Sequence, residues 1–285
     1  MIAVIDIGSN SVRYMGAEGG KTLFKKLKTT RLGEGISAAG RLSNAAMERT
    51  SRAVADFTKE ARGAGATQIF AFATAAVRSA QNGGEFVSRV KELCGLQVDV
   101  VSGEREARLG LYGAVGSRDG GIIDVGGAST EVSYMKGGAL CGCTSLPYGA
   151  VRLFDTCGSD QAKLKKAVKG LAPALKQITP CGTTYAIGGT ATTLAALHHK
   201  MKVYNPLLTD GTRLLREEAE EDFELLVSLS PKERMELCAM DEKRAEIIAG
   251  GTLLLFSVMQ ALRLTEITVS ERDNLEGYLI EKGLI

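Results

Sequence analysis

One short sequence pattern occurs twice in this chain. The segment Val4-Ile5-Asp6-Ile7-Gly8-Ser9 returns as Ile122-Ile123-Asp124-Val125-Gly126-Gly127. In each copy, an apolar stretch typical of a buried strand runs into an aspartate, a hydrophobic residue and a turn of small residues. A chain that repeats this unit is expected to fold into two related α/β halves.

The repeated corner has the composition of an anion site. An aspartate at the end of a strand projects its carboxylate from a rigid element, and the small residues after it let backbone N–H groups approach an anion closely. A single Asp-x-Gly is usually an ordinary turn, because both residues favour turns. Two such corners that face each other would form a phosphate and metal site, and the repetition favours this interpretation.

The composition excludes several classes of protein. Hydrophobic residues make up 45% and charged residues 24% of the 285 residues, as in soluble globular domains. The net charge of +2 gives no strong field that would indicate nucleic acid as a partner. The N-terminus lacks the features of a signal peptide, and no apolar run reaches the roughly 18 residues that span a bilayer. We expect a cytoplasmic protein without a membrane partner, and the sequence leaves a homodimer open.

The cysteines do not indicate a metal site. Six are scattered along the chain, and only Cys141 and Cys143 lie close together in sequence. The two histidines, His198 and His199, are adjacent, and no second cysteine pair has ligand spacing. We expect free thiols in a reducing compartment and no zinc site.

Hydrophobic periodicity predicts a similar order of elements in both halves. The predicted strands cover residues 2–7, 12–17, 22–27, 68–73, 97–101, 121–125, 130–135, 139–146, 185–187 and 266–269. The predicted helices cover residues 44–63, 85–93, 104–115, 160–178, 190–199, 216–229, a short stretch after Pro231, 241–262 and 273–282. The fold class is therefore α/β with two mixed sheets, divided into residues 1–117 and 118–285, and its active site is expected in the cleft between them. Whether the closing segment 273–285 packs back on the first half stays open.

A series of motifs makes the chain resemble a known family. They are Asp6-Ile7-Gly8-Ser9-Asn10-Ser11-Val12-Arg13, Arg31-Leu32-Gly33-Glu34-Gly35, Ala73-Thr74-Ala75-Ala76-Val77-Arg78, Ser102-Gly103-Glu104-Arg105-Glu106-Ala107-Arg108, Asp124-Val125-Gly126-Gly127-Ala128-Ser129-Thr130-Glu131 and Ile187-Gly188-Gly189-Thr190. In order and spacing the chain is similar to a short member of the exopolyphosphatase and guanosine pentaphosphate phosphohydrolase (Ppx/GppA) family. The resemblance implies the duplicated ribonuclease H-like fold of actin, hexokinase and Hsp70-like proteins.

The resemblance also implies a phosphoanhydride hydrolase. Glu106 matches the catalytic glutamate of the family, which would orient a water molecule and take its proton. The alternative is that Glu104 and Glu106 only favour the start of a helix electrostatically. Asp124 matches an acidic residue near Mg²⁺, and Glu131 and Asp6 are further candidate ligands. Each of these three carboxylates could instead accept hydrogen bonds from its own turn, Glu131 above all.

The same comparison assigns candidate phosphate contacts. Small residues in the turns would supply backbone and hydroxyl donors, and the turn at Gly188-Gly189-Thr190 precedes a helix. Arg78 matches a basic residue over the phosphate, whereas Arg13 and Arg31 are weaker candidates. The lysines at 163, 165, 166 and 169 favour a solvated helix face over a polyanion track. The candidate phosphate-binding residues are Gly8, Ser9, Asn10, Ser11, Arg78, Gly126, Gly127, Ser129, Thr130, Gly188, Gly189 and Thr190.

The chain departs from the family pattern in places. Ala128 stands where relatives carry a third glycine, and Arg105 replaces an acidic residue beside Glu106. The helical domain that long family members append after the second half is absent here, so a grip on the terminal few phosphates and a preference for short chains are expected. The expected activity is exopolyphosphatase with Mg²⁺. One alternative is a guanosine pentaphosphate phosphohydrolase. Another is a non-catalytic sensor that binds polyphosphate or an alarmone, in which Arg105 would indicate altered chemistry beside Glu106.

Overall fold

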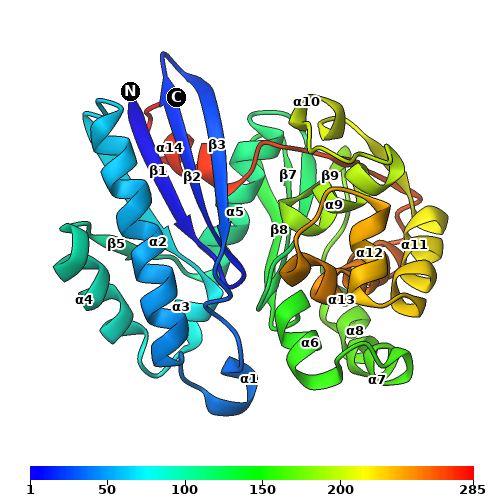
Figure 1. The fold of residues 1–285 in the computed structure, drawn as a ribbon. Helices are drawn as coiled ribbons and strands as arrows, with labels where there is room; N and C mark the ends of the chain where they lie inside the picture. Colours follow the sequence, from blue (N-terminus) through cyan, green and yellow to red (C-terminus); the bar gives the residue numbers. More distant parts are fainter.

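The structure is a computed structural model that describes residues 1–285, and it consists of two lobes, each built around one mixed β-sheet (Figure 1). The first sheet has the strand order β3-β2-β1-β4-β5 and the second β10-β11-β9-β6-β7-β8. Strand β1 is antiparallel to β2 and parallel to β4, and β6 is likewise antiparallel to β7 and parallel to β9. The same topology thus occurs twice, which confirms the predicted duplicated ribonuclease H-like fold.

Most strands lie where the sequence predicts them. The bounds of β1, β4, β8 and β11 are those predicted, and six others differ by one or two residues at an end. The short edge strand β10 was not predicted, because three residues show no periodicity. The strands are β1 (Ile2–Ile7), β2 (Ser11–Glu18), β3 (Lys21–Thr29), β4 (Gln68–Ala73), β5 (Val98–Val100), β6 (Gly120–Val125), β7 (Thr130–Lys136), β8 (Ala139–Leu146), β9 (Thr183–Ile187), β10 (Arg213–Leu215) and β11 (Glu266–Val269).

The long helices are also where they are predicted, with one correction. The helix predicted over residues 160–178 is broken into α7, a 3₁₀ turn at 168–170 and α8, because Gly170 and Pro173 interrupt the helical hydrogen bonds. Four short helices, α1, α3, α6 and α10, were missed. The helices are α1 (Ile36–Ala39), α2 (Asn44–Gly63), α3 (Ala75–Ser79), α4 (Gly83–Cys94), α5 (Gly103–Val115), α6 (Ala150–Cys157), α7 (Gln161–Ala167), α8 (Leu171–Ala174), α9 (Gly188–His198), α10 (Pro206–Thr209), α11 (Arg216–Ser228), α12 (Pro231–Leu237), α13 (Glu242–Ala261) and α14 (Asn274–Glu281). None of them is long and apolar enough to cross a membrane.

The last helix, α14, returns to the first lobe. Figure 1 shows it beside the blue strands, next to α5. Leu275, Tyr278 and Leu279 are buried against the first sheet, and the Tyr278 ring stacks on Phe72 with 4.8 Å between ring centroids. We propose that the two halves divide between residues 117 and 118, because this point separates the two sheets, and that α14 belongs structurally to the first half.

Two glycines let α5 and α14 pack closely. A Cβ atom at Gly277 would lie 1.8 Å from the carbonyl oxygen of Leu109, and a Cβ atom at Gly113 would lie 1.9 Å from that of Asp273. Both obstructing atoms belong to backbone, so no side-chain rotation could relieve the clash. The pair of helices is therefore held at one separation, and the first turn of each lies near the cleft.

Alanine at Gly277 is expected to lower the free energy of unfolding by roughly 2 kcal/mol or more, because the methyl group forces α14 away from α5. Urea unfolding at neutral pH measures this. Gly84→Ala is the matched control, since Gly84 is exposed, helical and faces open space, and it should be neutral or stabilise by about 0.5–1 kcal/mol. Equal effects of the two substitutions would contradict the packing argument.

Candidate active site

The two repeated corners have the same local geometry. In the first, the N–H of Gly8 donates to the carbonyl of Ser11 at 3.0 Å, and in the second the N–H of Gly126 donates to the carbonyl of Ser129 at 3.0 Å. A Cβ atom at either glycine would lie 3.1 Å from that same carbonyl oxygen. Each corner is therefore a tight turn between antiparallel strands that requires a small residue at its first position.

Both turns present free backbone donors. The N–H groups of Ser9 and Asn10 in the first turn, and of Gly127 and Ala128 in the second, donate to no acceptor within the protein. The turns face each other closely, since a Cβ atom at Gly127 would lie 2.9 Å from the Cβ of Ser9. Unpaired amide donors on facing turns are what an anion of several oxygens requires.

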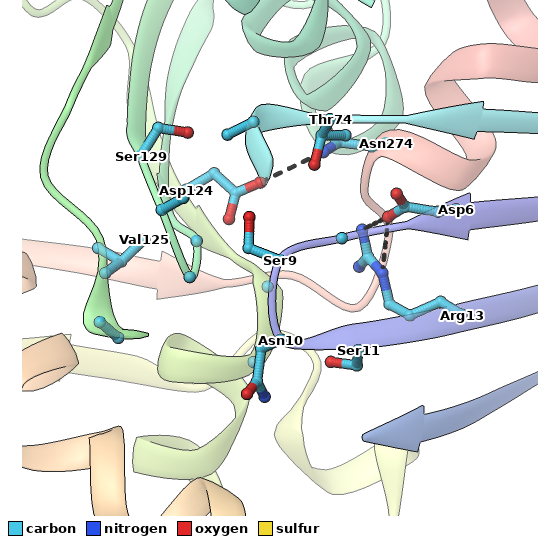
Figure 2. A pocket seen from close by; sticks show the side chains of 18 of the residues that line it. Asp6, Ser9, Asn10, Ser11, Arg13, Thr74, Asp124, Val125, Ser129 and Asn274 are labelled. Atoms are coloured by element: carbon cyan, nitrogen blue, oxygen red, sulfur yellow. Dashed lines mark hydrogen bonds and ion pairs between the residues drawn. The ribbon is translucent and has the colours of Figure 1, made fainter. Parts of the chain in front are cut away.

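A cavity of about 90 Å³ lies between the two turns (Figure 2). In Figure 2, Ser9 in the first turn faces Asp124 at the end of β6, with Asn274 beside Asp124 and Arg13 beside Asp6. Most of the site residues predicted from sequence line this one cavity. They are Asp6, Gly8, Ser9, Asn10, Ser11, Glu106, Asp124, Gly126, Gly127, Ser129, Gly188 and Gly189.

Two predicted phosphate contacts do not reach the cavity. The Thr130 hydroxyl donates to the carbonyl of Tyr148 at 2.6 Å, and the Thr190 hydroxyl donates to that of Val125 at 3.2 Å. Both threonines are buried. Because each hydroxyl has one hydrogen and uses it on backbone, these residues shape the turns and do not donate to a ligand here.

Glu106 lies in the first turn of α5, and its carboxylate is held by one cation. Ser102 caps the helix by accepting from the N–H of Arg105, and Glu106 is 7% exposed. Arg78 donates from Nη1 to Glu106 Oε2 at 2.8 Å and to the carbonyl of Val101 at 2.9 Å. Burial raises the pKa of Glu106 to about 7, against the opposing effect of Arg78. A carboxyl with this pKa can accept a proton near neutral pH.

The structure places Arg78 beside the cavity, in contact with Glu106, and its phosphate contact stays a prediction. Its guanidinium lines a neighbouring groove of about 580 Å³, formed with Ser79, Thr144 and Arg152, and it is not among the residues that line the smaller cavity. Arg78 influences the cavity by fixing the orientation of the Glu106 carboxylate, to which it donates a hydrogen bond.

Asp124 is buried at the end of β6 in a setting that disfavours its charge. Burial raises its pKa to about 7, with Arg13 opposing and Glu106 adding to the shift. Asn274 donates to Asp124 Oδ2 at 3.3 Å. A Cβ atom at Gly188 would lie 2.6 Å from Asp124 Oδ1, and Gly188 has a φ of 80°. Only glycine fits at that position without strain or a clash with the carboxylate.

Glu131 lies directly across from Asp124 in the β6–β7 register, on the same face of the sheet, but it is not among the residues that line the cavity. Its Oε1 accepts a hydrogen bond from Ser145 at 2.6 Å, and the residue is 1% exposed. Burial, followed by the charges of Glu106 and Asp124, raises the pKa of Glu131 well above its ordinary value. Glu131 thus forms a buried acidic cluster with Glu106 and Asp124, the two acids of this cluster that line the cavity.

On the opposite wall, Arg13 joins two carboxylates. It lies across from Asp6 in the β1–β2 register and bonds to Asp6 Oδ2, and it also bonds to Asp273, the N-cap of α14. The weaker phosphate candidate Arg13 is therefore already paired. Burial raises the pKa of Asp6, although Arg13 opposes the shift. Asp6 Oδ1, both polar atoms of the Asn10 amide and Asn274 Oδ1 are buried without a hydrogen-bond partner, so they require a ligand, an ion or water.

The predicted metal ligands do not form one three-carboxylate site. No three His, Cys, Asp or Glu side chains converge as a metal site. Asp6 shares its Oδ2 with Arg13, and Glu131 is bound by Ser145. Mg²⁺ commonly takes only one or two protein carboxylates and completes its shell with water and phosphate oxygens. Asp124 and the unpartnered oxygen of Asp6, which line the same cavity, fit that requirement.

Arg244 is a cavity residue that the sequence analysis missed. It lies in the first turn of α13, half-buried, and its guanidinium has no ion pair or hydrogen bond in the protein. It packs on the first turn of α9, since a Cβ atom at Gly189 would lie 2.1 Å from its Nη2. Burial lowers its pKa. One signal was available: a cation in the first turn of a helix is electrostatically unfavourable, so another role is indicated.

Arg31, Arg105 and the lysine group singled out from the sequence do not line the cavity. Arg31 pairs with Glu246 and donates to the carbonyl of Lys243 at 2.9 Å, so it joins the lobes at the side of the cleft. Arg105 pairs with Asp99 and Glu281, which removes the reason to expect altered chemistry beside Glu106. The lysine group lies on the exposed face of α7 and the adjoining turn, where Lys163 pairs with Asp160 and Lys165 with Glu224.

A second cavity, of about 330 Å³, adjoins the first on the side of Arg244. The two cavities share Arg13, Leu27, Gly188, Gly189 and Arg244. The rest of the second cavity is a mixed surface of cations, hydroxyls, acids and apolar side chains, among them Lys25, Lys26, Thr192, Tyr204, Met240, Glu271 and Leu275. A ligand longer than one phosphate can therefore extend from the first cavity past Arg244.

Sequence comparison places the chain among phosphatases. The Ppx/GppA phosphatase family matches residues 12–284. Exopolyphosphatase 2 of Mycobacterium tuberculosis is 29% identical over 97% of this chain and 96% of its own length. A guanosine-5'-triphosphate,3'-diphosphate pyrophosphatase of Photobacterium profundum is 28% identical over 99% of this chain, which spans 59% of that protein.

Solved structures agree with the sequence comparison. The Ppx/GppA family member of Aquifex aeolicus superimposes with a TM-score of 0.79 at 28% identity, covering 99% of this chain and 97% of that one. An exopolyphosphatase from Cytophaga hutchinsonii superimposes with a TM-score of 0.85 at 25% identity, covering 100% and 98%.

The buried charge of Glu106 predicts a stability effect. Its pKa rises from an ordinary value of 4.5 to about 7 on folding, so its stabilising contribution is complete below about pH 4.5 and is lost as the pH rises through 7. Glu106→Gln, which is always neutral, should raise the free energy of unfolding by roughly 1–3 kcal/mol at pH 8 and change it little at pH 5. Denaturant unfolding at both pH values measures this. Glu104→Gln, at an exposed position, should change either value by less than about 0.5 kcal/mol. A Glu106→Gln protein that is less stable than the wild type at pH 8 would contradict a raised pKa of Glu106 in the folded state.

Proposed function

This chain belongs to the Ppx/GppA phosphatase family, and on that basis we propose that it is an exopolyphosphatase that releases the terminal phosphate of inorganic polyphosphate, preferentially from short chains. One observation carries the proposal. Two facing turns with free backbone N–H groups enclose a cavity into which Glu106, held by Arg78, places a carboxylate of pKa about 7.

In the proposed reaction, Glu106 acts as the general base. Its carboxylate accepts a proton from water while the water oxygen bonds to the terminal phosphorus, and the bond from that phosphorus to the bridging oxygen breaks. The remaining chain leaves as a phosphate oxyanion. Arg78 fixes the carboxylate by a 2.8 Å hydrogen bond and keeps a fraction of it ionised at neutral pH despite burial.

The terminal phosphates would be held by the free donors of the cavity. The amides of the two turns bind the terminal group, and Arg244 meets the next phosphates where the first cavity opens into the second. An unpaired guanidinium binds phosphate oxygens strongly, because it offers several donors in one plane. The two cavities hold only a few phosphates, which is why short chains should suffice.

We propose Mg²⁺ as the cofactor. The cavity and its wall bring together Asp6, Glu106, Asp124 and Glu131, and each of these carboxyl groups has a raised pKa because it is buried. Asp124, oriented by Asn274, and the unpartnered Oδ1 of Asp6 would hold the ion. When bound, it would neutralise phosphate oxygens beside these carboxylates.

Guanosine pentaphosphate is the second candidate substrate. The adjoining cavity of about 330 Å³ has room and a mixed apolar and polar lining for a nucleoside, which inorganic polyphosphate does not need. Under this alternative, the guanosine would occupy the second cavity and the terminal phosphate of its triphosphate the first.

Phosphate release tests the proposed activity. With Mg²⁺, the protein should release phosphate from short-chain polyphosphate with a kcat/KM at least equal to that for long chains and above that for guanosine pentaphosphate. Glu106→Gln should lower kcat about 10²-fold or more with substrate binding retained, because an amide cannot take the proton. Glu104→Gln, the matched control on the same helix, should keep near wild-type turnover. Absence of release from polyphosphate of any length by the wild-type protein would refute the proposal.

The metal assignment predicts a change in Mg²⁺ requirement. Asp124→Asn should raise the Mg²⁺ concentration for half-maximal activity by roughly tenfold, because a charged oxygen ligand is lost from a site with few protein ligands. Glu131→Gln should shift this concentration less, since Ser145 occupies that carboxylate. A titration in which Asp124→Asn matches the wild type would show that Asp124 serves only its turn.

A further inference from the structure

We propose that Cys141 and Cys181 form a reversible disulfide that fastens the segment before β9 to the edge strand β8. The two residues are forty positions apart in sequence, yet their Sγ atoms lie 3.7 Å apart. All six cysteines are free thiols in this structure, and this is the pair whose sulfurs meet.

The local structure holds both thiols in place. Cys141 is the extra residue of a bulge in β8, where the register to β7 passes from Leu140 to Gly142. Cys181 also donates from Sγ to the carbonyl of Met135 in β7 at 3.4 Å. Next to them, Ile178 packs on Gly142, where an added Cβ atom would lie 3.1 Å from its side chain. The segment therefore crosses the end of the sheet as far as β8.

The remaining gap is small. A disulfide needs a sulfur–sulfur distance of about 2.05 Å, so each sulfur has to move by less than about 1 Å. Side-chain rotation can supply this, because Cys141 is exposed and Cys181 is only partly buried. The backbone contacts of the segment can stay as they are.

The chemistry requires a two-electron oxidant such as a hydroperoxide. Cys141 is the exposed thiol, so the oxidant meets it first: its sulfur takes one oxygen to become a sulfenic acid, and the peroxide is reduced to water or an alcohol. Cys181 then attacks that sulfur, the S–S bond forms, and the oxygen leaves as a second water. Burial raises the pKa of Cys181, so little of it is thiolate and it reacts slowly with the oxidant itself; its attack on the sulfenic acid is favoured because the two sulfurs lie side by side. A dithiol reductant restores both thiols.

The cross-link lies away from the candidate active site. Strands β6 and β9 run from this end of the sheet towards the cavity, and Cys181 precedes β9. Neither cysteine lines the cavity. The bond should therefore stabilise the second lobe and leave the catalytic geometry unchanged.

Oxidation and peptide mapping test the proposal. The full-length protein is treated with one equivalent of hydrogen peroxide, digested without reduction and analysed by mass spectrometry. We expect one major linkage, between Cys141 and Cys181, that is absent from Cys141→Ser and from Cys181→Ser. Cys143→Ser is the matched control and should keep the linkage, since Cys143 lies two residues away but directs its sulfur to the carbonyl of Glu104. A different major linkage, or none, would overturn the proposal.

Thermal unfolding gives an independent readout. Closing a loop of this length should raise the Tm of the oxidised protein by roughly 5 °C, and dithiothreitol should reverse the shift. Oxidised Cys181→Ser should show no such rise. A Tm that falls or stays constant when the Cys141–Cys181 linkage is present would overturn the stabilising role.

Discussion

The contact of Arg13 with Asp6 and Asp273 is the interaction on which the arrangement of the cleft depends. Arg13 and Asp6 face each other on the central hairpin of the first sheet, whereas Asp273 caps the helix that returns from the second lobe. Lys25 reinforces the junction through Glu276 in the same helix. Removing any one of these charges from water without a partner would carry a large desolvation penalty. The ion pairs offset this penalty because the charged groups lie within hydrogen-bond distance of one another. With α14 fixed in this way, Asn274 lies beside Asp124 on the opposite wall.

The other wall of the cleft is electrostatically unbalanced. Where the first hairpin sets Arg13 across from Asp6, the second sets Glu131 across from Asp124. Burial and the neighbouring acids raise the pKa of Glu131 well above its ordinary value and that of Asp124 to about 7. The duplicated framework thus carries a neutralised pair on one side and an acidic pair on the other. This asymmetry leaves room for a cation and a proton acceptor between two otherwise similar turns.

Close backbone approach gives the site its rigidity. Gly113 and Gly277 hold α5 against α14 without room for a methyl group, and this fixes the helix that carries Glu106. Gly188 leaves space for the Asp124 carboxylate in the same way. The proposed chemistry therefore rests on glycines outside the reacting groups, because the distances between carboxylates are set by the separation of backbones.

Local features were readable from the sequence, because turn chemistry and hydrophobic periodicity act over a few residues. The repeated Asp-x-Gly corners, the strands that lead into them and the placement of Glu106 at the start of a helix were all predicted before the fold was known. The partners of the charged side chains were not. Arg13 meets Asp273 across 260 positions, Arg105 is drawn away from the cavity by Glu281, and Arg244 is left without a partner inside it. Only the tertiary structure decides such pairings, because they depend on where α13 and α14 return to the cleft. A local sequence pattern does not specify which residues far apart in the chain come together there.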